Sequence, residues 1–364
     1  MNRVMIFFLA FILVLCVVQP FTASAADEAD VRDEITQEID GVLADYDLGI
    51  AYEDITDMSF SEISELIVGK LTSRLTAPMH MLTVIFLVVV LSAVIKNTAG
   101  GVLNGTSGEL YSMVSVISAV TVTAPQLMEI YSDTLTDIEL CGSFILVFVP
   151  VFSAAALLSG GFTTAGAYHM LMLGASELFV ELSDNWLLPV LGTTAALAAA
   201  GSVFPDSSLE SISSFLKKGV TFVVTAAMTL FTGFVGLKCT ICGKADGAAA
   251  KTAKMLVSSA VPIVGGAVSD AYATIKGSFE VIGGTVGAAG IIGVVILLLP
   301  KILEIFIYRG VMCAGAAAAD LFSVNAVSKL LKSFDSGLAI AQCILISYSL
   351  MFIISSAIIA QSIG

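Results

Sequence analysis

The side chains that could do chemistry in this chain are a few charges inside long apolar runs. Glu177 and Glu181 lie four residues apart in "LMLGASELFVELSDNW", and Glu304 and Arg309 lie in "ILEIFIYRGVM". A charge inside a membrane costs a few kcal/mol, so such groups usually turn inward or pair. For Glu177 and Glu181, a pathway-lining role and an interfacial polar face both stay open. For Glu304 and Arg309, whose charges are opposite, we predict a structural pair.

Residue patterns for catalysis or metal binding are incomplete. Cys239 and Cys242 have the spacing of half a zinc site, but no second pair or nearby histidine completes four ligands. His80 and His169 do not fit a metal-binding helix motif, and no G-x-x-x-x-G-K-[ST] loop occurs. We therefore expect a protein that is not an enzyme, has no cofactor or metal and binds no nucleic acid. Any step driven by ATP would need a separate ATPase.

The elements that carry these residues are predicted to be membrane helices. Hydrophobic residues make up 57% of the 364-residue chain and charged residues only 13%. Apolar runs recur that are long enough for a helix to cross about 30 Å of hydrocarbon. The sequence predicts an all-α, polytopic membrane protein with seven to ten membrane segments, located in the cell membrane.

The N-terminal region is predicted to be exported. Residues 1–25 combine a basic residue, an apolar stretch and a small-x-small site, which is typical of a signal peptide; an uncleaved anchor is the alternative. Residues 26–76 contain fourteen acidic and three basic residues, a balance of −11 out of the chain's −14. Their amphipathic helix pattern, with a capping box at Ser59 to Glu62, predicts an acidic helical segment outside the cytoplasm. It is either a solvated spacer or a docking surface for a basic partner.

Two stretches of the apolar body share a pattern of helix-breaking residues. Each begins with a Val-Pro pair, at Val149-Pro150 and Val261-Pro262, and continues through Leu-Leu-Pro, a phenylalanine and a polar linker. We therefore predict two related membrane repeats. The predicted order after residue 76 is first membrane spans and loop at 77–139, which ends in an acidic, solvent-facing stretch at 129–139, then repeat 1 at 140–237, a basic loop at 238–254, and repeat 2 at 255–364.

Broken helices are expected within the repeats. Backbone groups freed by a break at membrane depth must be satisfied by protein or water, so such elements should face the bundle interior. The expected pathway-lining or hinge residues, besides Glu177 and Glu181, are Pro150, Pro262, Gly265, Gly266 and Asp270. We expect an elbow after Gly266, and a re-entrant or interfacial element at 165–185 or 255–275. Gly283-x-x-x-Gly287 is predicted to be a helix contact face.

One region of the sequence resembles a known family. The run "GKADGAAAKTAKMLVSSAVPIVGGAVSDAYATIKGSFEVIGG" contains Ala245-Asp246-Gly247, Lys251-Thr252-Ala253-Lys254, Val261 to Gly266 and Ser269-Asp270-Ala271. These motifs, with the exported acidic segment and the polytopic body, are similar to the pattern of the stage III sporulation protein AE family.

The resemblance implies a specific setting. Members of the family act in the mother cell of endospore-forming bacteria, as the permease-like polytopic component of a secretion-like channel complex. The implied partners are ring-forming membrane proteins, a cytoplasmic ATPase and a forespore protein, with the chain in the mother-cell membrane around the forespore. The resemblance supplies no catalytic residues.

A second hypothesis keeps to the residues alone. Two related halves and intramembrane carboxylates are also typical of a stand-alone secondary transporter for a small solute. This alternative predicts uptake that depends on Glu177 and Glu181.

Overall fold

The computed structural model describes residue 37 and residues 60–98, 106–204, 209–260 and 265–363. Every element in these ranges is helical and none is a strand, which confirms the all-α prediction. The predicted signal peptide and most of the acidic segment lie outside the described residues. The elements are α4 (Phe60–Arg74), α5 (Thr76–Thr98), α6 (Thr106–Leu158), α7 (Phe162–Leu182), the π-helical η1 (Ser183–Leu187), α8 (Leu188–Val203), α9 (Leu209–Ala260), α10 (Gly265–Leu321) and α11 (Asn325–Ile363).

Six helices within the described residues are long and apolar enough to cross a membrane. Their outer faces carry exposed apolar side chains such as Leu87, Leu230 and Phe306, as a lipid-facing surface requires. Seven to ten segments were expected, which is more than the six candidates found among the described residues. The predicted boundary between the first spans and repeat 1, with its acidic stretch at 129–139, lies inside the single helix α6.

The prolines do not break the helices that contain them. Pro125 and Pro150 lie inside α6, and Pro300 lies inside α10. A proline removes one backbone hydrogen bond, which neighbouring helices can compensate in a packed membrane bundle. The expected break at Pro150 is therefore wrong. The chain turns back after Leu158 instead, where Gly160 adopts a positive φ of 88° that a glycine accommodates readily.

The expected elbow after Gly266 is also helical. Gly265 and Gly266 are the first two residues of α10, which then continues without interruption to Leu321. Asp270 lies in this helix; its side chain, like all of Pro262, lies outside the described part. Residues 165–185 do not turn back either, since α7, η1 and α8 follow one another as a single apolar rod from Phe162 to Val203.

The core forms where α10 packs against α6 and α11. Phe144, Phe148 and Phe152 stack along α6, with ring centroids 5.5 and 6.0 Å apart. Gly290 and Gly293 of α10 lie directly against Phe148 and Phe144; a methyl group added at Gly290 would come within 2.3 Å of the Phe148 ring. Glycines at these positions let the two helices approach closely.

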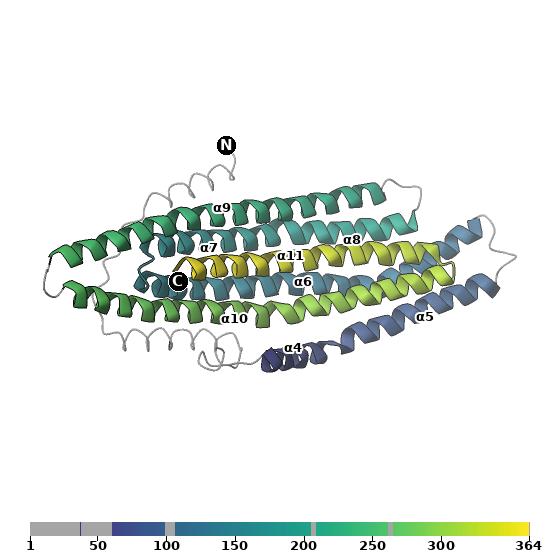
Figure 1. The fold of residues 1–364 in the computed structure, drawn as a ribbon. Coiled ribbons are helices and arrows are strands. Elements are labelled where there is room, and N and C mark those ends of the chain that lie inside the picture. The colour runs from purple at the N-terminus through teal and green to yellow at the C-terminus, as the bar shows by residue number, and fades with distance from the viewer. Residues whose placement is uncertain (1–36, 38–59, 99–105, 205–208, 261–264, 364) are drawn as a thin grey trace.

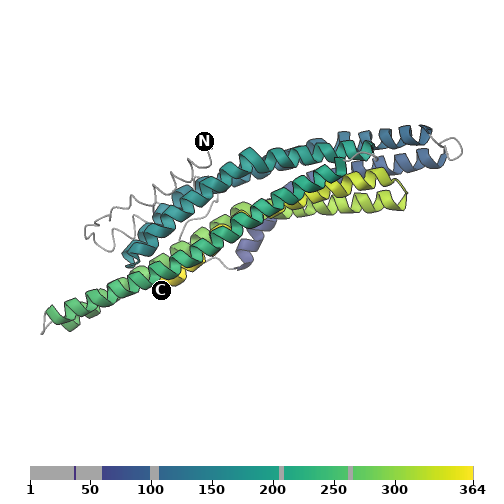
Figure 2. The same ribbon diagram turned by 90° about the horizontal axis from the view of Figure 1, so that it is seen from above.

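The helices lie side by side as an elongated bundle whose two ends differ (Figure 1). At one end, called here the turn end, α8 is followed by α9 and α10 by α11. Lys96, near the end of α5, donates to the Ser323 carbonyl in the α10–α11 turn at 2.7 Å. At the opposite end α9 and α10 project beyond the α6–α7 turn (Figure 2). We call this projection the arm.

Each predicted repeat contains a helical hairpin, α8–α9 in the first and α10–α11 in the second, and both hairpins turn at the turn end. Phe204 directly follows α8 and Phe322 directly follows α10, so the matched phenylalanines both lie at the turn end. Of the matched Val-Pro pairs, Pro150 is inside α6, whereas Val261-Pro262 lies outside the described residues. The repeat boundaries at 139/140, 237/238 and 254/255 fall inside α6 and α9.

Candidate functional site: a charged network between α4, α6 and α10

Charged side chains from three helices meet near the middle of α6. Lys301 of α10 is buried, with 1% of its side chain exposed, and its Nζ lies 2.9 Å from Asp133 Oδ2 of α6. The same Nζ lies 3.3 Å from Glu304 Oε2, one turn along α10. Arg74, the last residue of α4, donates from Nη1 to Glu304 Oε2 at 2.9 Å. We use the name charged network for these four residues and Asp137.

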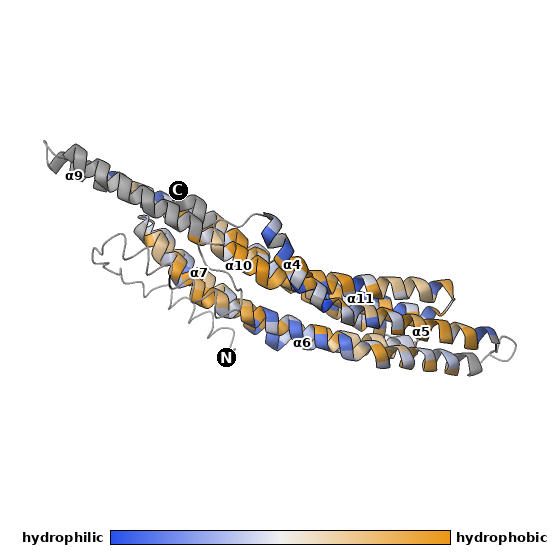
Figure 3. Cartoon of the chain, turned by 90° about the horizontal axis from the view of Figure 1, so that it is seen from below, coloured by the Kyte–Doolittle hydropathy of each residue, from blue (hydrophilic) through white to orange (hydrophobic). Residues whose placement is uncertain are grey.

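Helix periodicity places the members of the charged network on facing surfaces. Asp133 and Asp137 lie four residues apart on α6, and Lys301 and Glu304 lie three apart on α10, so each pair shares a helix face. Polar residues are visible along α4 and in the middle of α6, between apolar stretches (Figure 3). The acidic stretch 129–139, expected to face solvent outside a helix, is thus part of α6 and supplies two members of the network.

The charges of the network do not balance. Three carboxylates, on Asp133, Asp137 and Glu304, accompany two cations, on Lys301 and Arg74. Asp137 Oδ2 is buried and has no hydrogen-bond partner among the described residues. A buried charge costs several kcal/mol unless an opposite charge compensates it. Lys301 already has two carboxylate partners, Asp133 and Glu304. Asp137 is therefore the member of the network that can still accept a hydrogen bond or bind a proton or a small cation.

The cation contributed by α4 is permanent. Burial acts to lower the pKa of the Arg74 guanidinium, but the hydrogen bond to Glu304 and the nearby carboxylates outweigh that effect and hold the pKa above its usual value. Arginine is charged at every physiological pH. The arginine side of the ion pair that joins α4 to α10 therefore does not titrate in the physiological range.

A second set of polar contacts joins α9, α10 and α11. Arg309 of α10 donates from Nε to Asp335 Oδ1 and from Nη1 to Gln342 Oε1, both at 2.9 Å. Lys217 of α9 donates to the carbonyl and the hydroxyl of Ser333, also at 2.9 Å. These contacts hold the helices together between the charged network and the turn end.

The structure gives Glu304 and Arg309 different partners from the predicted ones. Glu304 bonds to Lys301 and Arg74, whereas Arg309 bonds to Asp335 and Gln342. The predicted pairing of the two with each other is therefore absent from the ion pairs of the described residues. A separation of five positions rotates a side chain about 140° around a helix, so the two face different neighbours.

Asp246 of α9 caps a helix distant in sequence. Its carboxylate accepts hydrogen bonds from the backbone N–H groups of Thr163 and Thr164, both at 2.9 Å, and from the Thr164 hydroxyl at 2.7 Å. These groups lie in the first turn of α7, where backbone N–H groups have no intrahelical partner. The Ala245-Asp246-Gly247 motif thus has a structural role, because it fixes the start of α7 against α9.

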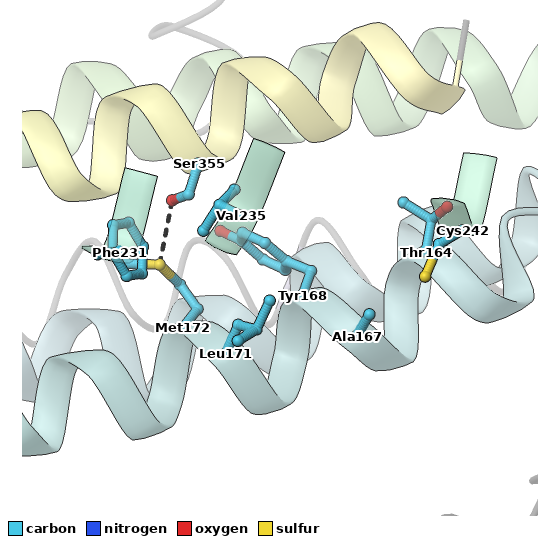
Figure 4. A pocket seen from close by; sticks show the side chains of 9 residues that line it. All are labelled: Thr164, Ala167, Tyr168, Leu171, Met172, Phe231, Val235, Cys242 and Ser355. Atoms are coloured by element: carbon cyan, nitrogen blue, oxygen red, sulfur yellow. Dashed lines mark hydrogen bonds between the residues drawn. The ribbon is translucent and has the colours of Figure 1, made fainter. Parts of the chain in front are cut away.

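Close to that cap, a small pocket lies between α7, α9 and α11 (Figure 4). Thr164, Met172 and Cys242 are among its lining residues, and Ser355 of α11 donates to Met172 Sδ at 3.0 Å. The lining is mostly apolar and no charged side chain contributes to it. Within the described residues this pocket reads as a packing feature of the α7–α11 contact.

The carboxylates singled out from the sequence lie elsewhere. Glu177 and Glu181 are on α7 with exposed side chains, and Pro150 of α6 is exposed as well. None of the three belongs to the charged network. Their pathway-lining or hinge role stays a prediction.

Sequence reasoning missed Lys301, Arg74, Asp133 and Asp137. A signal for two of them was present: Lys301 and Glu304 have the spacing of an ion pair inside an apolar run. For Asp133 and Asp137, the same helical spacing was obscured because the acidic stretch read as a boundary between two spans. Among the described residues, no group of histidine, cysteine, aspartate and glutamate is arranged to hold a metal ion.

Comparisons with known proteins point to one family. The family model described as "Stage III sporulation protein AE (spore_III_AE)" matches residues 49–362. A curated relative, stage III sporulation protein AE of Bacillus subtilis (strain 168), is 24% identical over 229 residues, which cover 61% of this chain and 56% of the relative. The match thus spans little more than half of the relative's length. No solved structure matches the chain.

Proposed function

The chain belongs to the stage III sporulation protein AE family, and from that membership we propose that it is the permease-like subunit of a channel complex that links mother cell and forespore. Its role is in sporulation and it carries membrane-spanning helices. In this proposal it is not an enzyme. It provides a membrane platform whose passage of material supports late forespore development.

The observation that carries the permease-like part of the proposal is the charged network. Ionisable groups buried between long apolar helices are expensive and commonly mark transport or proton pathways. Here five ionisable groups lie together: Lys301 and Glu304 are buried, Asp133 and Arg74 are about half exposed, and Asp137 has a buried oxygen without a partner among the described residues. A purely structural contact would be satisfied more cheaply by apolar side chains of similar volume.

The proposed partners follow from the family. They are ring-forming membrane proteins, a cytoplasmic ATPase and a forespore protein, with the chain in the mother-cell membrane around the forespore and its acidic N-terminal segment outside the cytoplasm. The charge imbalance supports a basic partner for that segment, since residues 26–76 carry most of the chain's net charge.

The transporter hypothesis has lost its main argument. It was based on two related halves and on Glu177 and Glu181 as intramembrane carboxylates, and both glutamates are exposed on α7. Family membership also places the chain among sporulation proteins.

The proposal is tested by complementing a deletion of the gene in its own host. Asp137→Asn keeps the size of the side chain but removes the carboxylate, and we expect heat-resistant spores to fall at least about tenfold with unchanged protein level. Lys301→Gln should also lower the protein level, because it leaves Asp133 and Glu304 without their buried cation. Spore counts, a late forespore reporter and immunoblots measure these effects.

Glu139→Gln is the matched control for Asp137→Asn. Glu139 is an exposed carboxylate on the same helix, so its variant should sporulate normally. Normal sporulation of the Asp137→Asn and Lys301→Gln strains would reject a functional network. Normal heat-resistant spores from the clean deletion would reject the sporulation role itself.

A further inference from the structure

A groove of about 920 Å³ opens near the turn end between α8, α9 and α11. Its described lining is strongly basic. Only Glu210 is acidic, against four lysines: Lys217, Lys218, Lys329 and Lys332. The groove is separate from the charged network, none of whose members lines it.

The groove is polar at one end and apolar at the other. Lys217 and Lys218 precede Phe222 along α9, and Lys332 precedes Ile340 along α11. Both helices begin at the turn end, so the lysines lie nearer to that end and the apolar side chains lie deeper along the bundle. From Lys332 to Ile340 the distance along the helix is about 12 Å.

Two of the lysines are held in place by the protein. Lys217 Nζ donates to the carbonyl and hydroxyl of Ser333 at 2.9 Å, and Lys332 Nζ lies 2.7 Å from Asp320 Oδ2. The hydroxyls of Ser213, Thr221 and Ser336 also belong to the lining. An anion in the groove would therefore meet several ammonium groups together with hydroxyl donors.

A membrane-spanning helix that ends at the membrane surface places its terminal turns among the lipid headgroups. The described helices that form it are membrane-spanning candidates, and it opens near their ends at the turn end. Basic pockets between membrane helices at such a level bind the headgroups of anionic lipids. A free soluble anion would use the lysines but would gain nothing from the apolar half of the groove.

We propose that this groove binds an anionic phospholipid, with the headgroup phosphate among the four lysines and an acyl chain along Phe222 and Ile340. A zwitterionic lipid of the same chain length lacks the net negative charge that the lysines select. The site would fasten α8, α9 and α11 to the leaflet at the turn end. This inference does not depend on the proposed channel role.

The test compares two variants of the purified full chain with equal loss of charge. In the groove variant Lys217, Lys218, Lys329 and Lys332 become glutamine. In the variant called the arm variant, Lys238, Lys244, Lys251 and Lys254, on the part of α9 that leads into the arm, become glutamine. Native mass spectrometry in detergent, with equimolar phosphatidylglycerol and phosphatidylcholine, counts the lipid retained per chain. We expect the wild type and the arm variant to retain phosphatidylglycerol selectively, and the groove variant to bind it at least about tenfold more weakly.

Further measurements distinguish a lipid from a free soluble anion and separate loss of the site from loss of folding. Inorganic phosphate at millimolar concentration should fail to displace the lipid. Phe222→Ser, which leaves every lysine in place and changes a side chain that is 73% exposed, should also weaken retention. Equal thermal unfolding of the two lysine variants keeps a folding defect from mimicking loss of the site. Equal retention by the groove and arm variants, or displacement by phosphate, would overturn the proposal; the first result indicates nonspecific attraction or a protein occupant, the second a free-anion site.

Discussion

At the scale of single residues, the strongest polar contacts in this protein join helices that are far apart in the chain. Lys301 and Asp133 are separated by 168 positions and Thr163 and Asp246 by 83. Each contact satisfies a group that would otherwise be costly to bury, a lysine ammonium in one case and unpaired helix N–H groups in the other. These few side chains therefore determine which helices lie next to each other.

The Asp246 cap gives a direct prediction. Asp246→Ala removes three hydrogen bonds to the first turn of α7 and should lower stability by about 1 to 2 kcal/mol, as loss of an N-terminal cap does. Asp246→Asn keeps an acceptor oxygen and should cost less. Thermal unfolding of the purified protein in detergent measures both; equal stability of Asp246→Ala and wild type would show that the cap is not needed.

The sequence predicted the chemical types of these residues better than their partners. Asp246 stands out within its motif, and Glu304 and Arg309 were expected to pair because their charges are opposite. Which helix faces each side chain depends on tertiary packing, and a single sequence does not show which helices pack against each other. Glu177 and Glu181 show the limit in another way, because four-residue spacing defines a helix face but not whether that face is covered.

At the scale of elements, the apolar runs predicted helices well and the prolines predicted their ends poorly. Pro125, Pro150 and Pro300 are all inside helices. A proline rarely ends a helix that is packed along its whole length. The free energy lost with one backbone hydrogen bond is smaller than the packing energy that would be lost if the helix were interrupted. The turn at Gly160 was not predicted, although the glycine pair at 160–161 is a signal for it.

The contact between α6 and α10 can be tested at its glycines. Gly290→Ala places a methyl group about 2.3 Å from the Phe148 ring, and such overpacking should destabilise the protein by about 1 to 3 kcal/mol. Adding Phe148→Leu should recover part of that loss, since the smaller side chain leaves room for the methyl group.

Gly310→Ala is the matched control in the same helix. Nothing lies within 4 Å of the methyl group it would add, so its stability should be unchanged or up to about 1 kcal/mol higher, as helix propensity predicts. Denaturant unfolding of the four proteins gives the comparison. A Gly290→Ala protein as stable as the Gly310→Ala protein would mean that α6 and α10 are not in close contact at this position.

At the scale of the whole molecule, the helices are longer than one bilayer is thick. The candidate span in α6 has 48 residues, a length of about 72 Å against about 30 Å of hydrocarbon. Lys301 lies about 30 Å along α10 from the turn end, so the charged network is one hydrocarbon thickness away from that end. The lysines of α9 also lie towards opposite ends of the bundle, with Lys217 and Lys218 near the turn end and Lys244 and Lys251 towards the arm.

This arrangement predicts that α9 crosses the membrane once. In a chain without its native cysteines, Lys251→Cys should react with an impermeant maleimide on intact cells, and Lys218→Cys only after permeabilisation. The turn end carries Lys96 together with the groove lysines, so the positive-inside rule assigns it to the cytoplasm. Labelling of both positions from the same side would contradict a single crossing.

The arm consists of two antiparallel helices that continue without a break into the bundle, α9 to the groove and α10 past the charged network. A pair of continuous helices resists bending, because bending would break backbone hydrogen bonds along both rods. A pull or push applied at the tip of the arm is therefore transmitted as a shift of the whole rods. The arm and the bundle are therefore mechanically coupled, so that a load on one side of the membrane displaces groups on the other.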